Sequence, residues 1–559
     1  MPVMRDGDRA NDRTRSVTGT VRGAVEWLLR QRRTDQAPRL SEQPSEALSD
    51  LKILVTADEA YREFERLVLS AKESLTAGFR IFDPDTRLLS DAARQVGDTW
   101  EDLIADALAR GVRIQIILSD FDPVFAPSLH RRSWMSQRRL TERAAAEGCA
   151  ERLEVDVHMH PSRSGYPIRL AAARTARRRL RDMARWINDQ GELRREEYLR
   201  DVPGLDGMLV RDETGKVSLA KGVIPPMRPI SHHQKLAVID RKALYVGGLD
   251  LDNRRQDDKS HDQAGPRTWA DVQLSFTGPA AASAEDHLLA FRDEVAGKRV
   301  PAASRDGLLR TLSVRRTGLG ALGLGPAPAV HELVDRTAEG VAGATQLIYL
   351  ETQFLRDLHL CRDLARRGQS IRDLGLIVCL PAAPEELAFE GAQGMDMRFG
   401  EHLQSRCVEI LSRAFGDRVS FVSPAQPRGM APDGTRGVLC GAPIVYVHSK
   451  VSIFDDRLAL VSSANLNGRS ARWDTELGVA LTDAAQVKRL RSRVMNHWLP
   501  EDPAPELLNP ATAAQAWGRL AEANRKRQPA EREGFLLPYP ASAPRKFGRP
   551  LPGVTQDIM

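Results

Sequence analysis

The chain has 559 residues, of which 42% are hydrophobic and 28% are charged. These fractions are normal for a soluble globular protein, and the length excludes a single ordinary core. Two or more domains, or one large pseudo-symmetric body, are therefore expected. The net charge of +6 is small for this length, so it permits an anionic partner without demanding one.

The sequence carries no signal for a zinc centre, a disulfide framework or a membrane span. Its five cysteines are odd in number, and no pair of them has close metal-ligand spacing. No run approaches 18 apolar residues, so no transmembrane helix is expected. The N-terminus also lacks the apolar core of a signal peptide. The locations left open are the cytoplasm, the membrane periphery and a non-Sec export route.

Residues 1–48 are polar and Arg-rich, and we interpret them as a mobile leader. Strands and helices then alternate, with helices predicted at 58–73 and 99–109 and strands at 51–56, 77–82 and 112–118. This alternation predicts a sheet covered by helices.

The alternation of strands and helices is interrupted between residues 127 and 200, where arginines become frequent and Trp134 and Trp186 occur among them. We interpret this stretch as a solvated helical insertion at the sheet edge, because charge runs are usually surface. A further strand is predicted inside it, at 153–159. The alternative interpretation is a basic, Trp-bearing surface that contacts anionic lipid head groups.

A loop rich in Gly and Pro at 318–329 is the predicted boundary between a first domain, 49–317, and a second domain, 330–499. The first domain ends with strands at 235–240, 243–249 and 268–274 and a helix at 283–297. The second domain repeats the alternation, with helices at 330–343, 357–367, 398–414 and 484–498 and strands at 346–354, 374–380, 419–422, 445–454 and 458–462. The last segment, 500–559, is rich in Pro, Ala and Arg and is predicted to be an arm or disordered tail.

One eight-residue pattern, His-x-Lys-x-x-x-x-Asp, occurs in both domains. It spans 233–240 in the first domain and 448–455 in the second, and a pair of small residues follows each copy after six residues. The composition of the chain gives about 0.03 matches by chance, so the repeat is meaningful.

A His and a Lys two positions later on a strand point to the same face of the sheet. If the two halves pack about a pseudo-two-fold axis, both pairs converge on one pocket. Two lysines suit binding of a phosphodiester and of the charge that grows on it in the transition state. Two histidines allow covalent catalysis, in which one attacks phosphorus and the other protonates the leaving alkoxide.

The Asp of each copy has the opposite parity and lies at the turn after the strand. It is expected to be structural, or to orient a His from another segment. No cluster of carboxylates suggests a divalent metal, so chemistry without a metal or cofactor is predicted.

At these residues the sequence resembles the phospholipase D superfamily, whose HKD motif matches both copies. The resemblance extends to the residues around each motif. In the second block these are Ser462-Ser463-Ala464-Asn465 and Glu476, and in the first block Gly247-Gly248 and Asp250. The strand 348–354, with Glu351 and Gln353, looks like the family's Tyr-x-Glu-Asn-Gln strand. Residues 268–272 and 278–280 resemble its Trp-x-Asp-Val and Gly-Pro elements.

The resemblance implies an α/β fold of two pseudo-symmetric α/β/α phospholipase D-like domains with mixed sheets that share one active site. It also implies a phosphohistidine intermediate, with His233 as nucleophile and His448 as general acid and base. The catalytic set that it implies is His233, Lys235, Asp240, His448, Lys450 and Asp455. Lys235, Lys450 and Asn465 would bind the phosphoryl oxygens, and Asp250, Glu351, Gln353 and Glu476 would support them. Asp250 stands where Asn465 stands in the other half, and an ionised Asp cannot donate a hydrogen bond, so it is expected to orient a neighbour.

The function implied is that of a phospholipase D that acts on a phospholipid substrate as a monomer. It would release phosphatidic acid and an alcohol, by hydrolysis or by transphosphatidylation. Peripheral contact with an anionic membrane surface is expected, and no nucleic acid. The alternatives are a phosphatidyltransferase of the cardiolipin-synthase kind, a nuclease-type phosphodiesterase, and a non-catalytic lipid-binding protein with the same fold.

Overall fold

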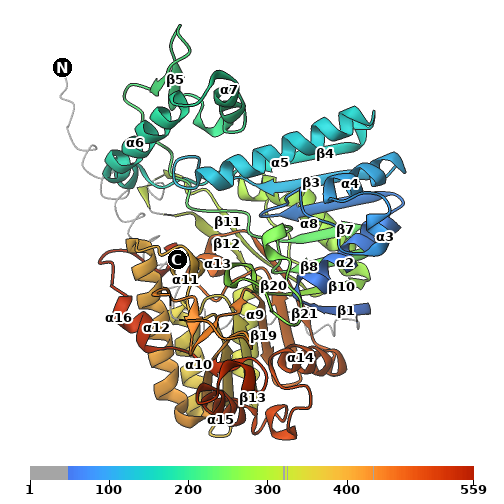
Figure 1. Cartoon of the computed structure of the whole chain (residues 1–559), viewed down its shortest axis with the longest axis vertical. Helices are drawn as coiled ribbons and strands as arrows, with labels where there is room; N and C mark the ends of the chain where they lie inside the picture. Colours follow the sequence, from blue (N-terminus) through green and yellow to red (C-terminus); the bar gives the residue numbers. More distant parts are fainter. Residues whose placement is uncertain (1–47, 319–321, 324, 432) are drawn as a thin grey trace, which may run out of the picture. The chain divides into compact units, whose positions relative to one another are not determined.

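The structure is a computed structural model that describes residues 48–318, 322–323, 325–431 and 433–559 (Figure 1). Residues 45–559 form one compact unit, and the predicted leader lies outside the described residues except for Leu48. Two mixed sheets organise this unit, and helices cover both of them. The α/β fold class is therefore confirmed.

The first sheet contains seven strands within the described part of the chain. In spatial order they are β1 (Ser49–Val55), β10 (Val272–Thr277), β8 (Ala243–Gly247), β7 (Leu236–Ile239), β2 (Ser74–Phe79), β3 (Arg113–Ser119) and β4 (Leu153–His158). Strands β2, β3 and β4 are parallel to one another. The pairs β1–β10, β10–β8, β8–β7 and β7–β2 are antiparallel.

The second sheet repeats this order and adds a strand at each edge. Its described strands are β12 (Ala327–His331), β11 (Leu308–Val314), β21 (Glu476–Leu481), β20 (Leu458–Ser462), β19 (Lys450–Phe454), β13 (Leu347–Thr352), β14 (Gly375–Cys379), β15 (Val419–Pro424) and β22 (Leu536–Pro538). Each half thus places one copy of the repeated pattern on a hairpin, β7–β8 or β19–β20, beside the first parallel strand.

Helices cover both faces of each sheet. On the outer face of the first sheet lie α2 (Thr56–Ser70), α4 (Trp100–Ala109) and α5 (Pro127–Ala146), with the short α3 (Asp91–Arg94) beside them. On the corresponding face of the second sheet lie α9 (Glu332–Gly343), α10 (Leu358–Ser370) and α12 (Met395–Phe415). Between the sheets lie α8 (Pro279–Val295) and α14 (Ala484–Trp498), and α15 (Ala513–Arg525) packs on β14, β15 and β22 of the second sheet.

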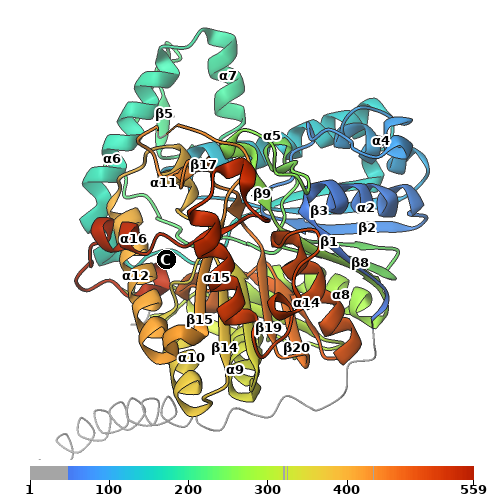
Figure 2. The same ribbon diagram turned by 60° about the horizontal axis from the view of Figure 1, so that its bottom comes forward.

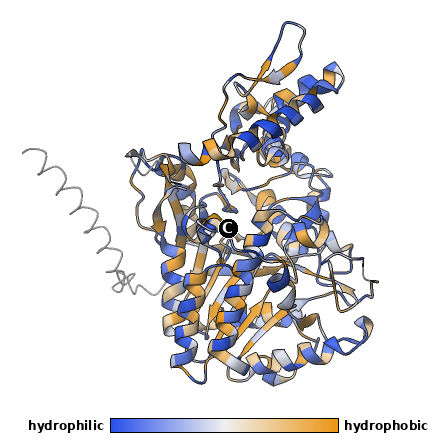
Figure 3. Cartoon of the chain, turned by 90° about the vertical axis from the view of Figure 1, so that its left-hand side faces the viewer, coloured by the Kyte–Doolittle hydropathy of each residue, from blue (hydrophilic) through white to orange (hydrophobic). Residues whose placement is uncertain are grey.

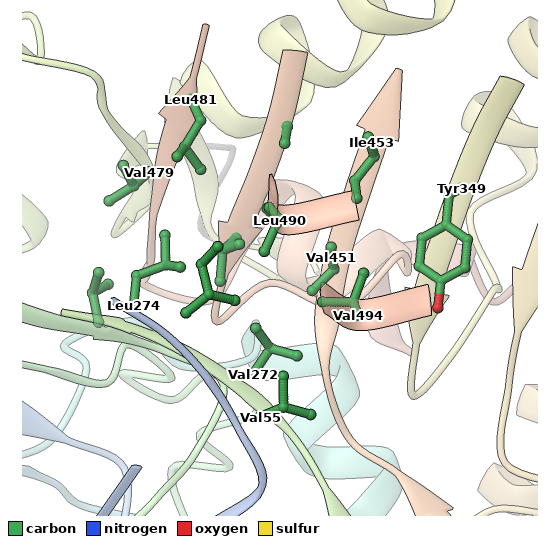
Figure 4. Close-up of a cluster of buried hydrophobic side chains, with 14 of the residues drawn as sticks. Val55, Val272, Leu274, Tyr349, Val451, Ile453, Val479, Leu481, Leu490 and Val494 are labelled. Atoms are coloured by element: carbon green, nitrogen blue, oxygen red, sulfur yellow. The ribbon is translucent and has the colours of Figure 1, made fainter. Parts of the chain in front are cut away.

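One buried apolar cluster crosses from the first sheet to the second. Figure 4 shows Val272 and Leu274 of β10 in the same cluster as Val451 of β19 and Val479 of β21. Burying an aliphatic side chain contributes about 1.5–3 kcal/mol relative to leaving it exposed, so this shared core holds the two halves together.

The predicted boundary at 318–329 is misplaced. Strand β11, which was assigned to the first domain, pairs antiparallel with β21 of the second sheet, and β12 pairs with β11. The change between sheets therefore occurs between α8 and β11. The loop rich in Gly and Pro joins β11 to the edge strand β12 of the same sheet, which is also a place where turn residues are required.

The predicted insertion at 127–200 also needs correction. Helix α5 packs on β4, and β4 pairs parallel with β3, so both belong to the repeated sheet unit. The additional segment starts after β4 and contains α6 (Tyr166–Asn188), α7 (Glu192–Arg200), β5 (Leu209–Arg211) and β6 (Val217–Leu219). Figures 1 and 2 both show these elements grouped beside the sheets, around a small apolar cluster of their own.

The C-terminal segment is folded, which corrects the expectation of a Pro-rich arm. Strand β22 pairs antiparallel with β15 at the edge of the second sheet. Trp517 of α15 is fully buried, and its Nε1 donates a hydrogen bond to the carbonyl of Leu507 at 2.9 Å. Apolar anchors spaced among Pro, Ala and Arg residues therefore attach this segment to the core.

The buried position of Trp517 predicts that this segment stabilises the protein. Trp517→Ala should lower the free energy of unfolding by about 3–5 kcal/mol, because it leaves a large cavity and an unpaired carbonyl. Urea denaturation followed by circular dichroism measures the change. The matched control is Trp186→Ala, whose side chain is 48% exposed and should cost less than about 1 kcal/mol. Equal losses in the two variants would contradict an anchoring role for Trp517.

Candidate active site

Two histidines from opposite halves are each held by a carboxylate of the other half. Nδ1 of His233 lies 3.0 Å from Oε2 of Glu476 and 3.0 Å from the carbonyl oxygen of Ser463. Nδ1 of His448 lies 2.6 Å from Oδ2 of Asp271. A carboxylate at Nδ1 fixes the orientation of the ring and directs Nε2 toward the site as the reactive nitrogen.

The backbone makes the same exchange between the halves. The amide of His233 donates to the carbonyl of Thr475 at 2.8 Å, and the amide of His448 donates to the carbonyl of Ala270 at 2.8 Å. The short strand β18 (Tyr446–Val447) runs parallel to β9 (Trp269–Ala270) just before His448. Each motif is therefore positioned by the segment that carries its carboxylate.

Both motif lysines are buried next to their histidines. Nζ of Lys235 donates to the carbonyl of His233 at 2.6 Å, and Nζ of Lys450 donates to the carbonyl of His448. Burial lowers the pKa of Lys235 to about 8 and that of Lys450 to about 7. Since an anion nearby favours the charged form, phosphate binding would raise both pKa values again.

Burial also keeps the histidines neutral. It lowers the pKa of His233 well below the ordinary value, with Lys235 as the next cause, and it does the same to His448, with Lys450 next. Burial raises the pKa of Asp271 to about 6 and also raises that of Glu476. A neutral imidazole keeps a lone pair on one nitrogen, which a nucleophile or base requires.

Asp250 and Asn465 occupy equivalent places with different partners. Oδ1 of Asp250 accepts a hydrogen bond from the amide of Ile81 at 3.0 Å and lies 3.7 Å from Nζ of Lys235. Oδ1 of Asn465 is buried and has no hydrogen-bond partner within the described part of the chain. Asn465 and Lys450 border a cavity of about 90 Å³ whose other walls come from α9, α10, strands of the second sheet and the segment 464–472. The geometry gives Asp250 a neighbour to orient and leaves Asn465 facing open space.

Glu351 and Gln353 lie behind the second motif. Glu351 accepts hydrogen bonds from Ser449 Oγ at 2.5 Å and from Trp498 Nε1 at 2.9 Å. Gln353 Nε2 donates to the hydroxyl of Tyr446 at 2.9 Å. Both side chains therefore support the segment that positions His448.

The motif aspartates lie away from the histidines and have a structural task. Oδ1 of Asp240 accepts from the amides of Glu73 and Ser74 at 2.8 and 2.9 Å. Asp455 binds the amides of 345–347, each at 2.9 Å. Each Asp therefore ties the turn of its hairpin to the start of the neighbouring strand, as the strand parity indicates, and Asp240 and Asp455 do not belong to the reacting set.

Comparisons with known proteins find similarities of three kinds. Residues 434–498 match the family model described as "Cardiolipin synthase, PLD-like domain". Phospholipase D A of Dictyostelium discoideum and Phospholipase D1 of Schizosaccharomyces pombe are each 23% identical to this chain, over 46% of it and 25% of their own length. A crystal structure of phosphatidylserine synthase from Haemophilus influenzae Rd KW20 is similar with a TM-score of 0.45 and 11% identity, covering 81% of this chain and 88% of that one.

The chain belongs to the phospholipase D superfamily. Its members are phosphodiesterases and phosphotransferases, and this chain spans about a quarter of the length of the two curated relatives. Among the described residues of this superfamily member, no group of three or more His, Cys, Asp or Glu side chains is placed to hold a metal ion. No helix in the same residues is long and apolar enough to cross a bilayer.

Three side chains near the superfamily's two histidines were not predicted as site residues. Asp271 was named only within a resembling strand, and its place opposite Glu476 in the repeat is the signal that identifies it. Arg80 and Arg255 both lower the pKa of the nearby Asp250 carboxyl, as does Lys235, which acts more strongly. Among the described residues, Nε of Arg80 and Nε and Nη1 of Arg255 are buried without a hydrogen-bond partner. No local pattern marks them, because packing alone brings them to the site.

The lowered lysine pKa values predict that oxyanion binding weakens as the pH rises. A group whose folded pKa is about 7 or 8 loses its charge above that pH, so affinity for tungstate should fall roughly tenfold or more between pH 7 and pH 9. Calorimetric titration of the protein with tungstate at several pH values measures this loss. Lys450→Ala is the comparison variant, with weak binding throughout the range. An affinity that is constant or rises with pH would contradict the assignment of these lysines as the anion-binding groups.

Proposed function

We propose that this protein is a phospholipase D that hydrolyses the head-group phosphodiester of glycerophospholipids. The observation that supports this most strongly is the exchange of carboxylates between the halves. Two buried histidines, each bound to a carboxylate from the other half, share one site with two lysines. The names of the two curated relatives support a phospholipid as the substrate.

His233 is suited to be the nucleophile. Its Nδ1 faces two acceptors, the carboxylate of Glu476 and the carbonyl of Ser463, so Nδ1 carries the proton and Nε2 carries the lone pair. Nε2 attacks phosphorus, and the alkoxide of the head group leaves with a proton from Nε2 of His448. Lys235 and Lys450 offset the charge on the phosphoryl oxygens during this step.

His448 is suited to move the proton in both steps. Its short contact with Asp271 stabilises the imidazolium that forms when the bound phosphodiester favours protonation. After the alcohol leaves, neutral His448 removes a proton from water, and the hydroxide attacks phosphorus. The bond to His233 breaks, which releases phosphatidic acid and restores the free imidazole. A primary alcohol in place of water would give transphosphatidylation.

Helix α6 is the surface that we propose meets the membrane. It carries seven arginines and one acidic residue, and Figure 3 shows much of its segment as hydrophilic. Leu170 and Trp186 are nonetheless 55% and 48% exposed. Basic residues with exposed apolar side chains favour the interface of an anionic bilayer, where the substrate lies.

A phosphatidyltransferase is the second candidate, because the family model that matches residues 434–498 is described by cardiolipin synthase. The same two steps serve this reaction if a lipid hydroxyl replaces water. The two reactions differ only in the molecule that accepts the phosphatidyl group, which is water in hydrolysis and a lipid hydroxyl in transfer.

A substrate panel tests the proposal. Phosphatidylcholine and phosphatidylethanolamine micelles with EDTA should yield phosphatidic acid, and added ethanol should divert product to phosphatidylethanol. Phosphatidylglycerol as donor and acceptor tests for cardiolipin, and single-stranded and double-stranded DNA test for nuclease activity. No turnover of any glycerophospholipid would refute the proposal.

Asp271→Asn should separate catalysis from folding. The amide cannot stabilise the imidazolium of His448, so kcat/KM should fall by about 10²–10⁴ while the melting temperature changes little. Mass spectrometry of released phosphatidic acid gives the rates. Asp286→Asn, which removes an exposed carboxylate of α8, is the matched control and should keep wild-type activity. Similar rates in both variants would contradict the role of Asp271.

A further inference from the structure

A second site rich in positive charge lies outside the catalytic residues. It is a cavity of about 290 Å³ at the start of α6, and four arginines line it: Arg163, Arg169, Arg315 and Arg316. None of the histidines, lysines or carboxylates of the catalytic site borders this cavity. Its volume lies near the lower end of the range of about 300–1,000 Å³ for small-molecule pockets, which suits a compact ligand.

The charge of these arginines is not neutralised within the described residues, where none of the four forms an ion pair. Arg169 donates to the carbonyls of Pro225 and Ile224 at 3.0 and 2.9 Å, and Arg316 donates to those of Gly325 and Pro326 at 3.0 Å. These neutral acceptors hold two guanidinium groups in place and leave their charge available. Arg163 and Arg315 have no protein hydrogen-bond partner in the same residues.

Two of the four groups, Arg163 and Arg169, are close enough to affect one another. Burial, followed by the charge of Arg163, lowers the pKa of Arg169. The neighbouring Arg228 also has a lowered pKa: burial is the largest cause, Arg163 and Arg315 contribute, and Asp122 and Asp120 oppose the shift. Placing like charges together costs free energy, and a bound anion removes that cost.

The start of α6 adds neutral donors to the same cavity. The helix has 23 residues, and its N-cap, Gly165, provides no side-chain cap for the first amides. A Cβ at Gly165 would lie 2.2 Å from the carbonyl oxygen of Leu322, so the close approach of that segment requires glycine here. Pro167 has no N–H, so the uncapped donors of the first turn are the amides of Tyr166 and Ile168, and these and the helix dipole favour an anion at this end.

Ser162 gives an independent indication of a ligand. Its side chain is 1% exposed and borders the cavity, and its buried hydroxyl has no hydrogen-bond partner among the residues that the structure describes. A buried hydroxyl that lacks a partner costs free energy, and an oxyanion in the cavity would accept its hydrogen bond.

We propose that this cavity binds a phosphate group, which the arginines, the Ser162 hydroxyl and the first amides of α6 hold together. Arginine binds phosphate oxygens through paired N–H groups, so two or more guanidinium groups around one anion give selectivity for phosphate. No histidine, cysteine, lysine or carboxylate is among the described residues that line the cavity, so nothing there activates a hydroxyl, and we assign it as a binding site and not a second catalytic site. The phosphate belongs either to a free small molecule or to an anionic lipid head group.

The test compares the double variant Arg163→Gln/Arg315→Gln with Arg174→Gln. Arg163 and Arg315 have no protein partner that their removal would disrupt, and Arg174 is an exposed arginine of α6 away from the cavity. Calorimetry with inorganic pyrophosphate should show one site fewer in the double variant than in wild type and Arg174→Gln. Because the readout is a difference of one site, it does not depend on whether the catalytic residues bind pyrophosphate or turn over lipid.

Vesicle sedimentation distinguishes the two sources of phosphate. Phosphatidylcholine vesicles with and without phosphatidic acid are incubated with each protein. Loss of the pyrophosphate site in the double variant supports a free phosphate compound. If only binding to phosphatidic acid vesicles falls, by about tenfold or more, the ligand is a lipid head group. Ser162→Ala should weaken the same binding to a smaller extent. If neither measurement separates the double variant from Arg174→Gln, the proposal is overturned.

Discussion

The structure depends on the exchange of a carboxylate between the two halves. Glu476 comes from the second sheet and holds His233 of the first, while Asp271 comes from the first sheet and holds His448 of the second. Neither histidine is oriented within its own half. The site therefore forms only when the sheets pack in one register, and the apolar cluster shared by β10 and β21 secures that register.

The two halves differ at the small residue that lies beside each exchanged carboxylate. A Cβ at Gly248 would lie 2.3 Å from Oδ1 of Asp271, so this short carboxylate requires a glycine opposite it. In the other half, Ser463 takes the place of Gly248, and its hydroxyl donates to Glu476 at 2.5 Å. A longer carboxylate with a serine and a shorter one with a glycine are thus two solutions to the same spacing.

The alternation of elements, both hairpins and the motif residues were predictable from the sequence, because these features depend on local periodicity and on a repeat. The sheet boundary and the C-terminal segment were not. Strand β11 joins β21 across more than 150 residues, and β22 joins β15 across more than 100, so no local pattern marks either pairing. The same limit applies to Asp271, whose partner His448 is 177 residues away in the chain.

The division of labour that we propose for the histidines rests on how each Nδ1 is held. Glu476 already accepts a hydrogen bond from Ser463 Oγ, so it attracts the proton of His233 less strongly, and the carbonyl of Ser463 shares that proton. This environment keeps one tautomer and changes little during a reaction. His448 has a single short contact to Asp271, whose pKa burial raises to about 6, and Lys450 Nζ lies 3.0 Å from the same Nδ1. An incoming anion changes the charge balance most around His448, Asp271 and Lys450. This supports His448 as the proton carrier and His233 as the nucleophile.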